Sequence, residues 1–170
     1  MRDFYDILTS RHSTRSFKDK KVSKEDLEKI VNAAKYAPNS RSRHLWKFIA
    51  TNDKKIVDEY CNDLKEALGV DEYTMYGAPA MVIVTDDRNY ANYIQNGAVA
   101  MQNIMLTAEY LGLSSVWIHP YKKQNDCEKV RKIYEKYKIP KTYNIIAVAA
   151  IGYEDEKHIR AEKKAIIEWL

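Results

Sequence analysis

The amino-acid sequence predicts an α+β domain with a small sheet and much helix. Segments with apolar residues at helical spacing alternate with short apolar or alternating runs that are typical of strands. Their order along the chain is helix, helix, strand, helix, strand, helix, strand, helix, strand. No internal repeat or low-complexity segment interrupts this order, and 170 residues suffice to bury a hydrophobic core. We therefore expect a single domain over residues 1–170.

The helices are predicted from apolar residues that recur every three or four positions. In chain order they cover residues 3–10, 23–37, 54–68, 92–111 and 125–137. Ser23 is the expected N-cap of the second helix, with Asp26 reaching back to a free amide, and Pro38 ends that helix. Gly69 is expected to close the third helix. The fourth is apolar over so much of its surface that we expect it to be buried centrally.

The strands are shorter and have a different pattern. They are predicted over residues 46–51, 80–85, 114–118 and 144–151. The first alternates between apolar and polar residues, so that Trp46, Phe48 and Ala50 share one face. The second and fourth are continuously apolar, as buried strands are. Before the first strand, residues 39–44 form a polar stretch that we expect to be a loop.

Composition argues against several classes of protein. The net charge of +4 is mild, and the lysines alternate with acidic residues, so we expect no nucleic-acid partner. No apolar run approaches the roughly 20 residues that cross a bilayer, and the N-terminus lacks a secretory signal, which predicts a cytoplasmic protein without membrane contact. Cys61 and Cys127 are expected to be structural thiols. The four scattered histidines show no metal-ligand spacing, so no metal site is predicted.

The most informative stretch is Arg-His-Ser-Thr-Arg-Ser-Phe at residues 11–17, called the basic run below. If it is extended, Arg11, Ser13 and Arg15 point the same way. Two fixed cations and a hydroxyl donor suit a phosphate or a planar polar ring with several acceptors. On local sequence alone, a solvated basic loop is an equal alternative.

Two further polar segments have the same character. One is the stretch at residues 39–44, and the other is the C-terminal tail with Arg160, Lys163 and Lys164. A phosphate-bearing cofactor held by distant segments would explain all three. The five glycines are isolated, which argues against a P-loop or a Rossmann fingerprint. The tail ends on apolar residues at 166, 167, 169 and 170, so it either packs back on its own domain or reaches a partner.

Five motifs, in order, resemble those of one family. Residues 11–17 are similar to its Arg-Arg-Ser-Ile-Arg-x-Phe pattern, and residues 37–48 to its Ala-Pro-Ser-x-x-Asn-x-Gln-Pro-Trp-x-Phe pattern. The helix residues 98–113, the Trp-Ile pair at 117–118 and the Ile-Gly-Tyr at 151–153 complete the series. Together they resemble the nitroreductase family of flavin mononucleotide (FMN) enzymes.

The resemblance implies a fold, an assembly and an activity. The fold would have a small central, mostly antiparallel sheet flanked by helices, in an intertwined homodimer with FMN at the interface. The flavin would accept hydride from NADH or NADPH and pass electrons to a small-molecule acceptor, such as a nitroaromatic or a quinone. The protein would supply position and electrostatics, so no catalytic side chain need be evident.

The resemblance also implies which residues bind FMN. Arg11 and Ser13 would hold the phosphate and ribityl end, and Arg15 would lie near the pyrimidine edge of the ring, where it tunes the flavin. His12 would either touch the flavin or point away from it. The remaining contacts would come from a basic pair that closes over the phosphate and from a loop of the other subunit. These are Lys163 and Lys164, and Pro38, Asn39, Ser40 and Ser42, respectively.

The sequence departs from the family at several of these positions. Ser42, His44 and Leu45 stand where the family has Asn, Gln and Pro. His119 and Pro120 replace the usual Gly near the flavin, and Pro120 has no N–H to offer it. His119 is a candidate flavin contact or a plain loop residue. A low-turnover flavin carrier or redox sensor is therefore an alternative to the enzyme, and a dimer that no longer binds flavin is a third hypothesis.

Overall fold

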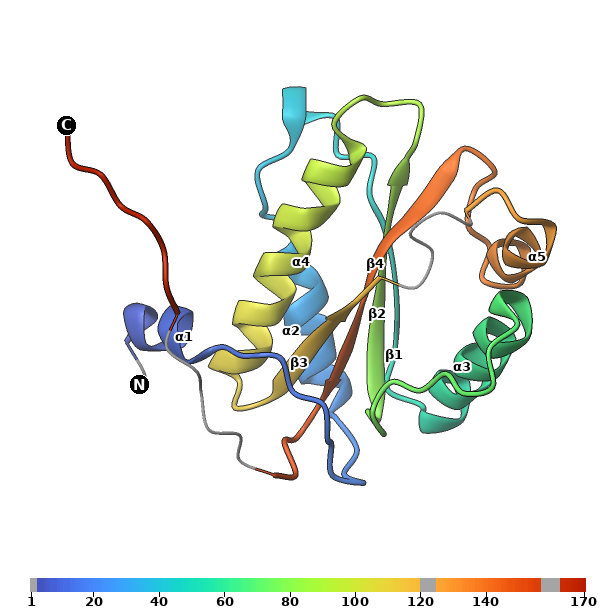
Figure 1. The fold of residues 1–170 in the computed structure, drawn as a ribbon, viewed down its shortest axis with the longest axis horizontal. Coiled ribbons are helices and arrows are strands. Elements are labelled where there is room, and N and C mark those ends of the chain that lie inside the picture. The colour runs from blue at the N-terminus through green and yellow to red at the C-terminus, as the bar shows by residue number, and fades with distance from the viewer. Residues whose placement is uncertain (1–2, 120–124, 157–162) are drawn as a thin grey trace.

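A four-stranded antiparallel sheet forms the centre of the computed structural model, which describes residues 3–119, 125–156 and 163–170. Its strands are β1 (Lys47–Thr51), β2 (Ala80–Asp87), β3 (Ser114–Ile118) and β4 (Tyr143–Gly152), in the spatial order β1-β2-β4-β3. Figure 1 shows helices α2 and α4 on one face of this sheet and α3 and α5 on the other. The central strands β2 and β4 are buried on both faces, which explains their continuous apolar sequences.

The helices agree with the predicted order. They are α1 (Phe4–Ser10), α2 (Lys24–Ala34), α3 (Lys54–Leu68), α4 (Tyr93–Tyr110) and α5 (Glu128–Lys136). One hydrophobic cluster packs α3 and α5 against the sheet, and a second packs α2 and α4 against the opposite face. The predicted α+β fold class is therefore confirmed. None of the described helices is long and apolar enough to cross a membrane.

Two predicted helix caps are present. The Ser23 Oγ accepts the Asp26 N–H at 3.0 Å at the start of α2, and α3 ends on Gly69, whose φ of 66° lies in the left-handed region. The Asp26 carboxylate, however, accepts the Ser23 hydroxyl at 2.7 Å and not a backbone amide. The Ser23 hydroxyl thus both accepts and donates at this cap. The predicted contact of Asp26 with a backbone amide was wrong, because Asp26 bonds to the Ser23 hydroxyl.

Two helices differ from the prediction by three residues at one end, and the other differences in helix bounds are of one residue. The second was expected to run to residue 37, but α2 ends at Ala34, and the next three N–H groups bond carbonyl oxygens three residues back. These tighter turns carry the chain to Pro38, whose ring disfavours helix in the residue before it. The fifth helix was expected from residue 125 but begins at Glu128. The polar stretch at 39–44, expected as a loop, contains the short 3₁₀ turn Ser40–Ser42.

Strand β1 follows its predicted alternation. Trp46 and Phe48 pack on the cluster with α2 and α4, whereas Ile49 packs on the opposite cluster. Ala50 lies on the same face as Trp46 and Phe48, as predicted: it is exposed, but it lines a depression together with Leu27 and Val31 of α2.

Helix α4 is the central helix, as predicted. It packs on α2 and on strands β2, β3 and β4, and its approach to β4 is so close that a Cβ at Gly97 would overlap the Ile146 side chain. Met101 is completely buried and Met105 nearly so. Two polar residues are buried with them, Asn96 in the first turn and Glu109 in the last. Asn96 bonds to Ser40 in the polar stretch at 39–44, and Glu109 bonds to Ser10, directly before the basic run.

Candidate functional site

The basic run lies along the edge of the sheet beside β3. Ser13 forms a parallel bridge with Ser115, whose carbonyl oxygen accepts the Thr14 N–H at 3.1 Å. Further along, Phe17 forms an antiparallel bridge with Glu154, just after β4. Figure 1 shows this segment in blue, passing β3 on its way from α1 toward α2. The sheet thus fixes the backbone of the run at two points.

Alternate side chains of the run point into the protein. Thr14 is completely buried, and the His12 Nε2 lies 2.6 Å from Glu154 Oε1. The other ring nitrogen of His12, Nδ1, lies 3.2 Å from the Ser10 carbonyl oxygen. The residues at the intervening positions are exposed or half-buried; these are Arg11, Ser13 and Arg15. This arrangement agrees with the predicted alternation, and contact of these residues with a cofactor stays a prediction.

A polar depression of about 370 Å³ separates the run from the end of α4. His12, Lys18, Lys20 and Glu109 are among the residues that line it. Glu109, in the last turn of α4, is nearly buried and accepts a hydrogen bond from the Ser10 hydroxyl at 2.6 Å. A charged acceptor makes such a bond strong. Glu109 therefore fixes the point at which α1 ends and the basic run begins.

The second polar segment centres on Ser40, at the other end of α4. The Ser40 N–H donates to Asn96 Oδ1 at 3.1 Å. The Tyr90 hydroxyl donates to Ser40 Oγ at 2.9 Å and to the Ser40 carbonyl oxygen at 3.2 Å, and Asn92 Nδ2 donates to the same Oγ at 2.9 Å. Four hydrogen bonds from the start of α4 and the residues before it thus hold Ser40 in place.

The backbone after Ser40 is strained. Arg41, Ser42 and His44 have φ values of 56°, 50° and 49°, in the left-handed region that favours glycine. Such residues persist only where their surroundings fix the conformation, and they cluster at functional sites. Here the Asn39 Oδ1 accepts the His44 N–H at 3.0 Å and closes the loop. The strained loop thus has contacts at both ends, and Pro38 before it is exposed.

A buried carboxyl lies beneath this loop. Asp86, near the end of β2, is completely buried. Its Oδ2 accepts the Asn96 Nδ2 at 3.2 Å, and its Oδ1 accepts the Asp87 N–H at 2.8 Å. Burial raises the pKa of Asp86, against the opposing effect of these two hydrogen bonds. Asp86, Asn96 and Ser40 therefore form one chain of hydrogen bonds from the core to the loop.

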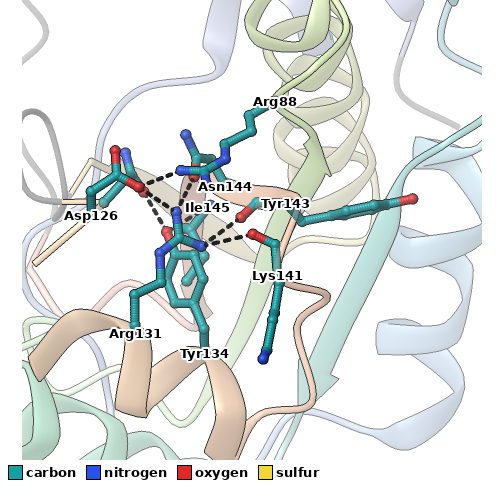
Figure 2. Close-up of polar contacts among 9 residues, drawn as sticks. Arg88, Asp126, Arg131, Tyr134, Lys141, Tyr143, Asn144 and Ile145 are labelled. Atoms are coloured by element: carbon teal, nitrogen blue, oxygen red, sulfur yellow. Dashed lines mark hydrogen bonds and ion pairs between the residues drawn. The ribbon is translucent and has the colours of Figure 1, made fainter. Parts of the chain in front are cut away.

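His119 is exposed at the end of β3, and Pro120 lies outside the described residues. The chain resumes at Asn125 beside a cluster around Arg131 and Asp126, drawn in Figure 2. Arg131 donates to Asp126 at 2.9 Å and to Asn144 at 3.1 Å, and the Arg88 guanidinium also pairs with Asp126. These cations lower the pKa of Asp126. The cluster ties the start of α5 to β4.

The C-terminal tail reaches the basic run. The Lys163 ammonium donates to the Arg11 carbonyl oxygen at 3.3 Å, whereas Lys164 is exposed and Arg160 lies outside the described residues. Beyond Lys164 the tail has no regular structure, and Figure 1 shows it, in red, leaving the body of the protein. Its apolar side chains are largely uncovered, with Ile166 95% and Trp169 91% exposed.

Nine of the eleven predicted site residues fall into two groups in the protomer, and the other two are Lys164, exposed beside Lys163, and His119 at the end of β3. Arg11, His12, Ser13, Arg15 and Lys163 gather near the last turn of α4, and Pro38, Asn39, Ser40 and Ser42 gather near its first turn. Figure 1 shows the two groups at opposite ends of this helix. The structure brings together the members of each group and does not bring the two groups together.

Four supporting residues were missed by sequence reasoning: Asp86, Asn96, Glu109 and Glu154. Each has a polar side chain beside or within an apolar segment, which is the signal that could have found them. A polar residue at a position that the hydrophobic pattern buries requires a partner, because an unpaired buried polar group is costly. The identity of that partner depends on the fold.

Comparison with known proteins gives one consistent result. The sequence model described as the Nitroreductase family matches residues 8–153. A protein of Archaeoglobus fulgidus, provisionally named NADH dehydrogenase/NAD(P)H nitroreductase, is 29% identical over 162 residues, which cover 92% of this chain and 89% of the relative.

Two solved structures are similar over nearly the whole chain. An FMN-dependent nitroreductase of Clostridium difficile is 31% identical, with a TM-score of 0.78 and coverage of 93% of this chain and 91% of that one. A nitroreductase of Bacteroides fragilis with bound FMN has a TM-score of 0.85 and covers 99% of this chain at 24% identity, which bears on the fold alone. The predicted fold, a small antiparallel sheet flanked by helices, is thus confirmed.

Proposed function

Because this chain belongs to the nitroreductase family, we propose that it is an FMN-dependent NAD(P)H oxidoreductase. Its acceptors would be nitroaromatic or quinone-like compounds. The names of the Archaeoglobus fulgidus relative and of the Clostridium difficile structure support the activity and the cofactor. The observation that carries the proposal is the basic run, whose backbone is fixed at the sheet edge and whose Arg11 carbonyl oxygen accepts the Lys163 ammonium.

The donors present fit FMN. The guanidinium groups of Arg11 and Arg15 and the Lys163 ammonium match a ligand that carries a phosphate and a ring with several acceptors. At the other end of α4, the Asn39 Nδ2 is buried and has no hydrogen-bond partner among the residues that the structure describes. Since buried donors are almost always paired, this amide suits an acceptor on a bound ligand.

FMN, when bound, supplies the two-electron chemistry. The chain's own residues bind and orient it. Arg11 and Ser13 would hold the phosphate and ribityl end, with Lys163 and Lys164 closing over the phosphate. Arg15 would place a fixed cation at the pyrimidine edge, where negative charge gathers on reduction, and would thereby favour the reduced ring.

We propose that the functional unit is a homodimer. The two groups of site residues lie at opposite ends of α4 and cannot meet within one protomer. A second copy with its α4 reversed would bring its Ser40 loop to the basic run of the first, and a two-fold axis would form two equal sites. The uncovered apolar tail supports the same assembly, since such side chains are seldom left in water.

A low-turnover flavin carrier or redox sensor is the second candidate. It is favoured by one observation: His119, exposed at the end of β3, replaces a Gly of the family pattern and is followed by Pro120. A proline cannot offer a backbone N–H to the flavin ring. A site without this donor would bind the flavin without promoting its turnover.

One experiment separates these functions. The purified protein is examined for the absorption spectrum of FMN and then mixed with NADH or NADPH without oxygen. Bleaching of bound flavin, followed by recovery on addition of a nitroaromatic or quinone, supports the oxidoreductase. Bound flavin that neither nucleotide reduces supports the carrier, whereas a protein that rejects added FMN contradicts both. Free FMN with each nucleotide is the control for direct reduction.

A further inference from the structure

We propose that Asp86 and Asn96 are positioning residues for the cofactor. Asp86 fixes the orientation of the Asn96 side-chain amide, and Asn96 in turn fixes the Ser40 loop, defined here as residues 39–44. The inference rests on the proposed function, because it is the FMN site to which this loop is assigned. Neither residue would touch the flavin, so the effect of each passes through Ser40.

The donors and acceptors in the hydrogen-bond chain from Asp86 through Asn96 to Ser40 allow only one arrangement. An ionised carboxylate only accepts hydrogen bonds, and both Asp86 oxygens do so, Oδ1 from the Asp87 N–H and Oδ2 from Asn96 Nδ2. The Asn96 NH₂ must therefore face Asp86, and its carbonyl oxygen must face the other way. There it accepts the Ser40 N–H at 3.1 Å. The charge on Asp86 thus determines which end of Asn96 meets Ser40.

The burial of this chain of hydrogen bonds explains why the Asp86 carboxylate and the Asn96 amide must be paired. Asp86 is completely buried and Asn96 is 4% exposed, so their polar atoms are costly unless they are paired. Asn96 lies in the first turn of α4, where the helix dipole favours a nearby negative charge. The first five residues of β2 are apolar and buried, whereas Asp86 itself stands between Thr85 and Asp87 at the polar end of the strand.

The Ser40 loop needs such a restraint. Ser40 directly precedes Arg41 and Ser42, which both have positive φ values. A backbone of this kind is held by its surroundings and not by its own preferences. The Tyr90 and Asn92 contacts fix the hydroxyl and carbonyl oxygen of Ser40, but among the described contacts only Asn96 binds its amide. Loss of that bond would release the loop at its start.

The decisive variant is Asp86→Asn, which keeps the shape of the side chain and removes one acceptor. An asparagine at 86 can accept either the Asp87 N–H or the Asn96 NH₂, but not both. If it keeps the bond from the Asp87 N–H, the side-chain amide of Asn96 must reverse. The Asn96 NH₂ would then face the Ser40 N–H, and two donors would meet. The double variant Asp86→Asn with Asn96→Asp restores every donor–acceptor pair at unchanged net charge.

Two measurements follow each variant. The first is FMN affinity, from the quenching of flavin fluorescence on titration. The second needs no cofactor: it is the hydrogen-exchange rate of backbone amides in the Ser40 loop of the apoprotein. We expect Asp86→Asn to weaken FMN binding by about tenfold and to speed exchange in the loop, since a buried hydrogen bond is lost. The double variant should return both values to within about twofold of the wild type.

A matched control separates positioning from general stability. Ile133→Val lies in the cluster on the opposite face of the sheet and removes one buried methylene. It should lower the urea midpoint while leaving FMN affinity and loop exchange unchanged. The inference is overturned if Asp86→Asn binds FMN like the wild type, or if the double variant binds no better than the single one. Failure of the wild type to bind FMN would instead contradict the proposed function.

Discussion

Ser10 and Ser40 are hydrogen-bonded to opposite ends of the same helix. The Ser10 hydroxyl donates to Glu109 at 2.6 Å in the last turn of α4, and the Ser40 N–H donates to Asn96 at 3.1 Å in its first turn. At 1.5 Å of rise per residue, Asn96 and Glu109 are about 20 Å apart along the helix axis. The rigid helix therefore keeps the basic run and the Ser40 loop apart within one protomer.

This separation predicts complementation between two defective variants. Arg11→Ala removes the basic-run contact, and Asn39→Ala with Ser40→Ala removes the loop contacts. If each site takes its two halves from different copies, mixed dimers contain one intact and one doubly defective site. Random exchange of equal amounts should restore about a quarter of the wild-type FMN sites. Flavin absorbance of the mixture at low FMN concentration measures this, and an absence of recovery would place both halves in one protomer.

Much of the fold could be predicted because its signals are local. Gly69 ends α3 through its own φ, and Ser23 caps α2 through its own hydroxyl. The apolar sequence of β4 likewise indicates that the strand is buried. The Ser40–Ser42 turn was missed because its conformation depends on hydrogen bonds from Tyr90 and Asn92, some fifty residues away. Only the tertiary fold supplies those partners.

The residues assigned to cofactor contact could be predicted from the sequence, but the buried partners that hold the site in place could not. The alternation of Arg11, Ser13 and Arg15 is a property of the run itself. The Glu154 partner of His12 lies just after β4, far along the chain, and the Asp86 partner of Asn96 lies in β2, before α4. A sequence pattern indicates that a buried polar residue needs a partner, but only the topology indicates which one it meets.

Replacement of Arg11 should weaken cofactor binding and leave the fold intact. Arg11 is half-buried at the start of the basic run, where we assign it to the FMN phosphate. Loss of a hydrogen bond to a charged group costs about 1.5–3 kcal/mol, so Arg11→Ala should weaken FMN binding accordingly. Fluorescence titration measures the change. Lys21→Ala removes the same charge at an exposed position and should leave the affinity close to that of the wild type.

Arg15 should affect the flavin's redox potential more than its affinity. Arg15 is exposed in the protomer, and we assign it to the edge of the ring that gains negative charge on reduction. Arg15→Ala should lower the midpoint potential by about 30 mV or more, the equivalent of about 1.4 kcal/mol for two electrons. Titration against a reference dye measures the potential. Arg15→Lys keeps the charge and should shift it less; equal potentials in all three proteins would remove the assigned role.

The two cysteines should differ sharply in reactivity. Cys61 is buried between α3 and the sheet, and burial raises the pKa of its thiol to about 11, whereas Cys127 is exposed. Only the thiolate attacks a disulfide reagent. At pH 8 one thiol should therefore react promptly in the native protein and two in urea. Cys127→Ser should abolish the prompt reaction; a fast thiol remaining in that variant would contradict the burial of Cys61.

Removal of the tail should weaken the dimer before it weakens the fold. Ile166, Ile167, Trp169 and Leu170 are largely exposed in the protomer, and the tail beyond Lys164 packs on none of the described core. If these side chains are buried on a partner, each contributes about 1.5–3 kcal/mol to association. A chain that ends at Lys164 keeps both basic residues and should dissociate at far higher protein concentration than the full chain. Sedimentation of both across a dilution series measures this, and equal dissociation constants would show that the tail has another role.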